Sequence, residues 1–193
     1  MIQPLDALRA LAQHRGDAIV VPTMTTVEPW HELSPSDVNI SCIGFMGGAS
    51  SLGLGLALAR PERKVLVLDG DGSLCMQLGT LATIAGAAPP NLYHFVFKNG
   101  VYQVSGSQPI PAAERIDFAL MARGAGYPLV YSFDDLEDLR VRLPEVLAAR
   151  GPVFVQLLTA PMPNPPEGGI IYTSFSAEAE AARAALLGRT ATA

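Results

Sequence analysis

The sequence is poor in charge and in cysteine, and it contains no run of basic residues. Only 16% of its 193 residues are charged, and 18 acidic against 13 basic side chains give a net charge of −5. A nucleic-acid-binding surface needs clustered Lys and Arg to neutralise phosphates, so no nucleic-acid partner is expected. The two cysteines, Cys42 and Cys75, lie 33 residues apart in apolar stretches. This spacing indicates reduced thiols and argues against a disulfide framework or a Cys-based metal site.

An export signal is also missing from the N-terminal residues. Asp6 and Arg9 fall where a signal peptide needs an apolar stretch. Residues 39–59 are uncharged and long enough to cross a bilayer, but they include five glycines. A strand, a tight turn and a small-residue helix explain this run better than a membrane span. We therefore expect a cytoplasmic protein without a membrane partner.

Along the sequence, the spacing of apolar residues alternates between patterns typical of strands and of helices. Six strands are predicted, at 18–21, 38–43, 65–68, 92–97, 129–131 and 153–158. Helices are predicted over 5–12, 48–59, 73–85, 116–123 and 177–187, with one more that is capped by Asp134 or Ser132 and ends at Ala149. Residues 23–37 are predicted to be a loop with one helical turn.

This alternation predicts an α/β fold with three layers, α/β/α, around a mostly parallel central sheet. Residues 1–160 would form one domain. The Pro-rich segment and C-terminal helix within 161–193 would pack on that same domain.

Ligands of such a sheet bind beyond the carboxyl ends of the strands. The residues there are Gly44–Gly48, Gly70–Ser73 and Asn99–Ser107. Asp71 stands between two glycines directly before a helix, where free N–H groups attract phosphate. A carboxylate beside a phosphate needs a cation between them, and Asn99 adds a carboxamide oxygen. Mg²⁺ prefers this mixture of oxygen ligands.

The spacing of these residues is similar to a known signature. Residues 73–98, 26 in number, separate Gly-Asp-Gly from Asn99. This motif resembles the diphosphate-binding (PP) domain of thiamine-diphosphate-dependent enzymes. Two runs, GFMGGASSLGLGLALARPERKVLVLDGDGSL and NGVYQVSGSQP, resemble more specifically the sulfopyruvate decarboxylase β subunit and the C-terminal half of phosphonopyruvate decarboxylase. The chain departs from these relatives at Phe45, Lys98, Gln103 and Ser107.

The resemblance implies a metal site and a diphosphate site. Mg²⁺ would be held by side-chain oxygens of Asp71 and Asn99 and by the backbone carbonyl of Val101. The diphosphate of thiamine diphosphate would bind at the loop formed by Gly70, Asp71, Gly72 and Ser73.

Four further residues are implied to act at the cofactor's rings. Met46 would wedge between the two rings, and the Gly44 carbonyl would accept a hydrogen bond from the 4′-amino group. Val104 and Ser105 would lie near the thiazolium, where the substrate arrives.

The resemblance also implies a reaction and a partner. The chain would be the β-type subunit of a 2-oxoacid decarboxylase, a carbon–carbon lyase that acts on a small 2-oxoacid such as sulfopyruvate or phosphonopyruvate. A pyrimidine-binding-domain (α-type) subunit would supply the glutamate that activates the cofactor, within a homo- or hetero-oligomer. Two alternatives stay open: a cofactor-binding or interaction subunit without decarboxylase activity, and the carboligase half of an acetolactate-synthase-type enzyme.

Simpler interpretations also exist for single residues. Asp71 and Asn99 are both common in turns beside glycine, and Met46 could be a core methionine. The histidines match no motif, so each is expected to be a surface or core residue: His14, His31 and His94.

Overall fold

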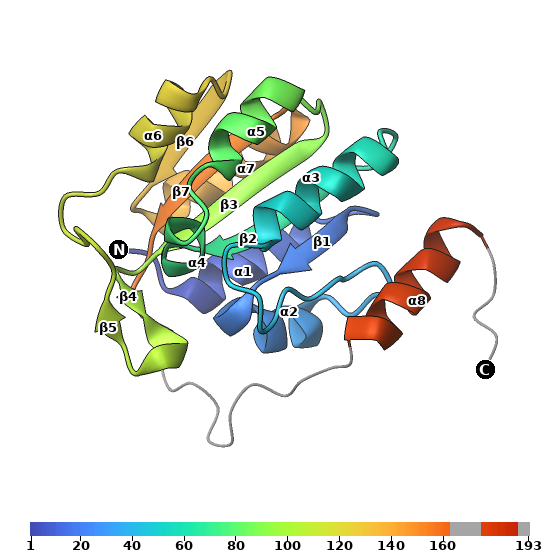
Figure 1. The fold of residues 1–193 in the computed structure, drawn as a ribbon, viewed down its shortest axis with the longest axis horizontal. Helices are drawn as coiled ribbons and strands as arrows, with labels where there is room; N and C mark the ends of the chain where they lie inside the picture. Colours follow the sequence, from blue (N-terminus) through green and yellow to red (C-terminus); the bar gives the residue numbers. More distant parts are fainter. Residues whose placement is uncertain (163–174, 189–193) are drawn as a thin grey trace.

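Five parallel strands form the central sheet, in the spatial order β1–β2–β3–β7–β6 (Figure 1). The structure is a computed structural model that describes residues 1–162 and 175–188. The strands are β1 (Ile19–Pro22), β2 (Val65–Gly70), β3 (Leu92–Lys98), β6 (Leu129–Phe133) and β7 (Val153–Leu158). All four neighbouring pairs are parallel. Except for β6, the strands consist almost wholly of buried residues, as expected for a sheet that helices cover on both faces.

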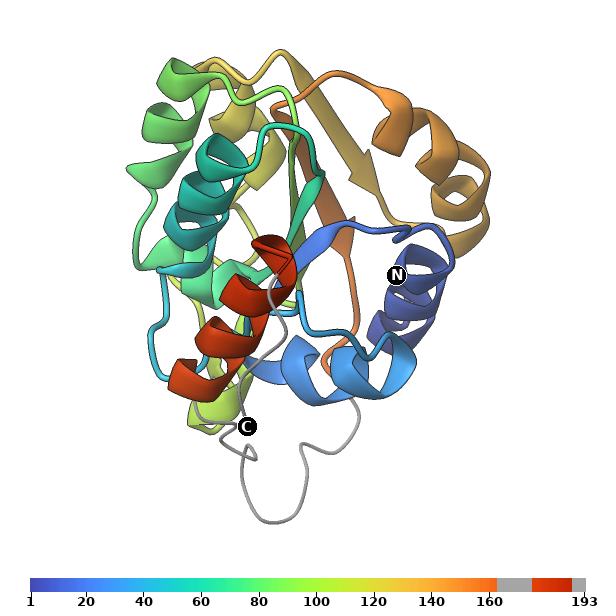
Figure 2. The same cartoon turned by 90° about the vertical axis from the view of Figure 1, so that its right-hand side faces the viewer.

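Helices form a layer on each side of the sheet, as Figure 2 shows. One layer comprises α1 (Pro4–Gln13), α2 (Val27–Leu33) and α7 (Leu136–Ala148). The other comprises α3 (Ala49–Ala59), α4 (Asp71–Cys75), α5 (Thr80–Ala87), α6 (Phe118–Ala125) and α8 (Phe175–Leu186). Side chains of each strand alternate between the layers, so that Leu66 and Leu68 face the first core and Val65 and Val67 the second. The predicted three-layer α/β/α fold with a parallel sheet is confirmed.

Short helices and strands lie at the carboxyl end of the sheet. The 3-10 helix η1 (Met24–Thr26) follows β1. After β3 comes a small antiparallel hairpin of β4 (Val101–Tyr102) and β5 (Gln108–Pro109), with the 3-10 helix η2 (Gln103–Ser105) between its strands. Residues 23–37 were predicted to be a loop with one helical turn. They contain more helix than that, because η1 runs directly into α2.

The strand predicted at 38–43 is wrong as a regular strand. Isolated bridges pair this segment with β1, at Val20 with Asn39 and at Thr23 with Cys42. Pro22 has no N–H, so it cannot make the ladder bond that would follow the bond from Ile40 N to Val20 O. The pairing therefore stays fragmentary.

The helix predicted over 73–85 is also wrong, since it divides into α4 and α5. Between them, the amides of Met76, Gln77 and Thr80 each bond to the carbonyl three residues earlier, as in tight turns. The Thr80 hydroxyl also donates to the Gln77 carbonyl, 2.9 Å away. These bonds turn the chain before α5 begins.

Several helix ends differ from the predictions by a few residues. Helix α7 is capped by Asp135, and not by Asp134 or Ser132, because its Oδ1 accepts from the amides of Glu137 and Asp138. Helix α6 starts at Phe118, after the cap Asp117. Helix α8 starts at Phe175, and its buried Ala182 packs into the second core. That 161–193 belong to the same domain stays a prediction, since 163–174 and 189–193 lie outside the described residues.

Both cysteines are free thiols, as predicted. Burial raises the pKa of Cys42 and of Cys75 to about 11, which keeps both protonated near neutral pH. Among the described residues, every helix is too short or too polar to span a bilayer.

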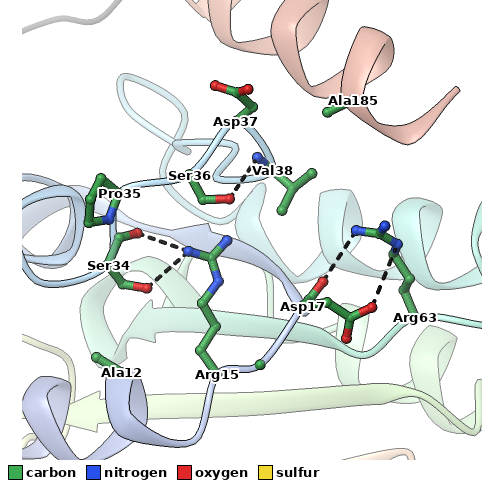
Figure 3. A pocket seen from close by; sticks show the side chains of 11 residues that line it. Ala12, Arg15, Asp17, Ser34, Pro35, Ser36, Asp37, Val38, Arg63 and Ala185 are labelled. Atoms are coloured by element: carbon green, nitrogen blue, oxygen red, sulfur yellow. Dashed lines mark hydrogen bonds and ion pairs between the residues drawn. The ribbon is translucent and has the colours of Figure 1, made fainter. Parts of the chain in front are cut away.

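At the amino ends of β1 and β2, a polar pocket of about 500 Å³ opens (Figure 3). Arg15 lies in its wall and is only 8% exposed. Its guanidinium donates to the Ala18 carbonyl and to both the carbonyl and the hydroxyl of Ser34. Ser34 caps the C-terminus of α2, where the helix dipole favours a cation. Arg15 therefore connects the turn before β1 to the end of α2. Burial lowers the pKa of its guanidinium, so these carbonyl acceptors are needed to stabilise the buried charge.

Replacing this arginine tests how much that connection stabilises the fold. We expect Arg15→Met to lower the free energy of unfolding by about 2–4 kcal/mol, because buried carbonyls lose their donors. Arg9→Met is the matched control. Among the described residues, the Arg9 side chain bonds only to Asp6, and it is 56% exposed, so its loss should cost under about 0.5 kcal/mol. Equal urea midpoints for the two variants would contradict this role of Arg15.

Candidate functional site

Hydrogen bonds join three loops at the carboxyl ends of β2 and β3. The Gly47 amide donates to Ser73 Oγ at 3.0 Å, which connects the loop before α3 to the start of α4. The Gly100 amide donates to Asp71 Oδ2 at 2.6 Å, which connects the end of β3 to the same start of α4. The three segments that the sequence singled out therefore meet at one edge of the sheet.

Asp71 is a deeply buried charged group of this site. It is 1% exposed, and its other oxygen, Oδ1, accepts from the Gly72 amide at 2.8 Å. Burial raises the pKa of the Asp71 carboxyl, while hydrogen bonds from the Gly100 and Gly72 amides oppose that shift. Within the described part of the chain, no basic side chain lies within salt-bridge distance of Asp71. A bound cation would balance this buried negative charge.

Asn99 and Val101 lie beside Asp71, on either side of Gly100. Asn99 Oδ1 accepts from the Val101 amide at 3.0 Å, and Asn99 Nδ2 points toward Gln103 Oε1 at 3.4 Å. In residues 1–162 and 175–188, no cluster of three or more His, Cys, Asp or Glu could hold a metal. The predicted set instead combines a carboxylate, a carboxamide and a backbone carbonyl. These oxygen donors suit Mg²⁺ and would be poor ligands for softer metals.

Two glycines of the site lie in close contact with aromatic rings. A Cβ on Gly72 would lie 2.6 Å from the Tyr102 ring, and one on Gly48 would lie 2.0 Å from the Phe45 ring. Any larger residue would push these rings away. Phe45, one of the departures from the relatives, packs over the Gly48 backbone while 66% of it stays exposed.

The residues predicted to act at the cofactor's rings occupy two places. Gly44 has a φ of +73°, which favours glycine, and it lies with half-buried Met46 in the loop that Gly47 attaches to Ser73. Met46 belongs to neither core of the described residues, which favours a site role over a core role.

Val104 is half-buried and Ser105 is exposed, both in η2. Helix η2 contacts η1, but no hydrogen bond among the described residues joins Val104 or Ser105 to the other site residues. The roles of all four residues stay predictions.

The sequence analysis missed a buried pair behind the site. Asp69 and His94 are both fully buried, with His94 Nε2 3.2 Å from Asp69 Oδ2. Asp69 Oδ1 accepts from the Gly70 amide at 2.9 Å and so fixes the turn that leads into Asp71. A carboxylate at the end of the apolar run 65–68 was the available signal. His94 is a core histidine, as expected.

A second missed contact involves Gln103. Its carboxamide bonds to the backbone of Met162, which follows β7. The two residues are 59 positions apart, so no local pattern reveals the contact.

Comparison with known proteins agrees with the resemblance. Residues 28–157 match the family model described as "Thiamine pyrophosphate enzyme, C-terminal TPP binding domain". The chain is 40% identical over 154 residues to a phosphonopyruvate decarboxylase of Streptomyces viridochromogenes, covering 79% of this chain and 38% of that protein. It is 35% identical over 162 residues to the sulfopyruvate decarboxylase subunit beta of Methanothermobacter thermautotrophicus, covering 83% of this chain and 84% of that one.

A solved structure with the same fold is the benzoylformate decarboxylase of Polynucleobacter necessarius. Its TM-score is 0.68 at 18% identity, and the match covers 86% of this chain and 34% of that one. At this identity the likeness supports the fold alone. The family match, by contrast, covers more than half of the chain, and the sulfopyruvate decarboxylase β subunit is similar over most of both sequences. On these grounds the chain belongs to the thiamine pyrophosphate enzymes and carries their C-terminal TPP-binding domain.

Proposed function

We propose that the chain is the β-type subunit of a thiamine-diphosphate- and Mg²⁺-dependent 2-oxoacid decarboxylase, with sulfopyruvate or phosphonopyruvate as the substrate class. The observation that carries this proposal is the environment of the Asp71 carboxylate. It is buried, no basic side chain of the described residues lies within salt-bridge distance of it, and it is bonded to the loop that contains Asn99. The more distant charge of Lys98 stabilises it only in part, since burial still raises its pKa. The relatives at 35–40% identity are decarboxylases of these two substrates. The chain spans only 38% of that phosphonopyruvate decarboxylase, so the whole activity is part of the proposal.

The residues at this edge of the sheet would divide the cofactor between them. Asp71, Asn99 and the Val101 carbonyl would hold Mg²⁺. The Gly70–Ser73 turn would bind the diphosphate, with Gly72 and Ser73 as its donors. Without ligand, the Gly72 amide bonds to Asp71 Oδ1 and Ser73 Oγ accepts from the Gly47 amide, so the diphosphate would take over the Gly72 donor. Thiamine diphosphate supplies the nucleophilic carbon and the electron sink for loss of CO₂ from a 2-oxoacid.

The second loop would orient the cofactor's rings. Met46 would hold them at a fixed angle, and the Gly44 carbonyl would accept a hydrogen bond from the aminopyrimidine. Val104 and Ser105, on η2, would border the space where the 2-oxoacid enters.

Exposed apolar side chains beside the site support the need for a partner chain. Phe45 and Met76 are 66% and 54% exposed, and both flank the Gly47–Gly48 turn. A partner that brings the pyrimidine-binding domain and its glutamate would cover them. The relative that this chain matches over 84% of its length is named a subunit beta, which agrees with an α-type partner.

Two of the residues that differ from the relatives make hydrogen bonds to the backbone beside the site. The site is therefore ordered despite these differences, which favours a functional site over one that has lost its role. Lys98 Nζ donates to the Ile116 carbonyl at 2.6 Å, and Gln103 bonds to Met162. Carboligation and a non-catalytic role are the outcomes that the assay below separates from decarboxylation.

Removing the charge of Asp71 tests the metal site. We expect Asp71→Asn to weaken thiamine diphosphate binding roughly 10- to 100-fold or more and to make it insensitive to added Mg²⁺, because even outer-shell partners of metals have effects of that size. Asn99→Ala should act in the same direction but less. Calorimetry with the partner present measures the affinity. Asp37→Asn, an exposed carboxylate at the opposite end of the sheet, is the control, and equal affinity in all variants would refute the metal assignment.

Replacing Met46 distinguishes a role at the cofactor from a role in the core. As a wedge, Met46→Ala should leave the melting temperature within about 2 °C while it slows hydrogen exchange at the reactive carbon of the bound cofactor. A core methionine would instead lose about 2–5 kcal/mol of stability with normal exchange. Met121→Ala, on α6 and 40% exposed, is the control for loss of a methionine.

The two-chain active site predicts inactivity of the isolated chain. Co-expression with an α-type partner should give a stable hetero-oligomer that releases CO₂ and an aldehyde from sulfopyruvate or phosphonopyruvate. Longer carbon products would indicate carboligation, and no turnover with tight cofactor binding would indicate a non-catalytic subunit. A monomer that decarboxylates unaided, judged by light scattering and CO₂ release, would rule out the shared site.

A further inference from the structure

Gln103 holds the backbone of Met162 in both directions. Its Nε2 donates to the Met162 carbonyl at 2.5 Å, and its Oε1 accepts from the Met162 amide at 2.9 Å. Among side chains, a carboxamide is suited to this pairing because it presents a donor and an acceptor side by side. A carboxylate at this position would place a second oxygen against the Met162 carbonyl. The pairing is thus specific for Gln over Glu at this position.

Met162 lies where the chain leaves the sheet. The last backbone bonds of this exit run from the Thr159 amide to the Lys98 carbonyl and from the Ala160 amide to the Ile2 carbonyl, each at 3.0 Å. The Gln103 side chain makes the next bond along the chain. It therefore fixes the exit from β7 to the hairpin that follows β3.

The same carboxamide oxygen also faces Asn99. Asn99 Nδ2 lies 3.4 Å from Gln103 Oε1, and Asn99 Oδ1 accepts from the Val101 amide. With its nitrogen turned toward Gln103, Asn99 keeps its oxygen on the side of Val101, whose carbonyl is the other proposed ligand of this loop. Gln103 thus opposes a flip that would present the amide nitrogen.

We propose that Gln103 is a positioning residue that couples the chain exit at Met162 to the orientation of the Asn99 carboxamide. This inference rests on the proposed function, since Asn99 matters as a metal ligand only if the cofactor site is used. Gln103 itself touches neither metal nor cofactor in this role. It acts through Asn99, and its own anchor is the backbone of Met162.

The test compares Gln103→Met, which removes donor and acceptor at similar length, with Gln103→Glu, which keeps only the acceptor. Amide hydrogen exchange of Met162 and Val101 is measured by NMR on the full chain without ligand. Gln103→Met should speed exchange at Met162 about tenfold and at Val101 about threefold, as expected for loss of hydrogen bonds of ordinary net strength. Gln103→Glu should speed exchange at Met162, because its second carboxylate oxygen replaces the donor to the Met162 carbonyl and repels that carbonyl. Exchange at Val101 should stay near wild type, because Asn99 Nδ2 keeps an acceptor.

Cofactor affinity provides the second measurement, with thiamine diphosphate and Mg²⁺ as the probe. Gln103→Met should bind about three- to tenfold more weakly at fixed Mg²⁺, again the size of one or two net hydrogen bonds. Gln108→Met, an exposed glutamine on strand β5 of the same hairpin, should match wild type in every measurement.

Two results would overturn the inference. In one, Gln103→Met leaves exchange at Met162 unchanged. In the other, Met162 loosens while Val101 exchange and cofactor affinity stay at wild-type values, which makes Gln103 a purely structural tie. If wild type together with its partner binds no thiamine diphosphate with Mg²⁺, the proposed function fails, and the exchange rates of the ligand-free chain still decide whether Gln103 holds Asn99.

Discussion

The buried carboxylate of Asp71 is the constraint on which the rest of the site depends. Its two oxygens accept from the amides of Gly72 and Gly100, so a single side chain joins the start of α4 to the end of β3. Neutral N–H groups stabilise the charge without removing it, and burial still raises the pKa of the carboxyl. In the proposed function, Mg²⁺ would therefore meet a carboxylate whose position these two amides already fix.

Around this carboxylate the backbone must come unusually close to side chains. Gly72 allows the Tyr102 ring to pack on the turn, and Gly48 does the same for Phe45. Behind them, the Asp69–His94 pair holds the Gly70 amide from within the core. The loops are consequently supported from both sides: by rings packed on glycine backbone outside and by a buried polar pair inside. This support allows irregular backbone to keep a defined geometry at a strand end.

How far the sequence predicts this molecule depends on how local each signal is. The strand at 153–158 follows from a local apolar pattern, so it was predictable. The meeting of the Asp71 and Asn99 loops was also predictable, because their spacing matches a known motif. The segment 38–43 failed because one proline, Pro22, interrupts a ladder on the neighbouring strand. The bond between Gln103 and Met162 was invisible because it joins positions 59 residues apart, and only the folded sheet brings them together.

The two ends of the sheet resolve buried charge in different ways. At the amino end, Arg15 is surrounded by the carbonyls of Ala18 and Ser34 and lies at the C-terminus of α2, so neighbouring acceptors satisfy the cation and its role is stability. At the carboxyl end, the Asp71 carboxylate accepts from two backbone amides, and no basic side chain of the described residues lies within salt-bridge distance of it. These neutral donors balance the buried charge only in part, since burial still raises the pKa of the Asp71 carboxyl. In the proposed function, Mg²⁺ held by Asp71, Asn99 and the Val101 carbonyl would complete that balance, and this is the physical reason to propose function at this end of the sheet and stability at the other.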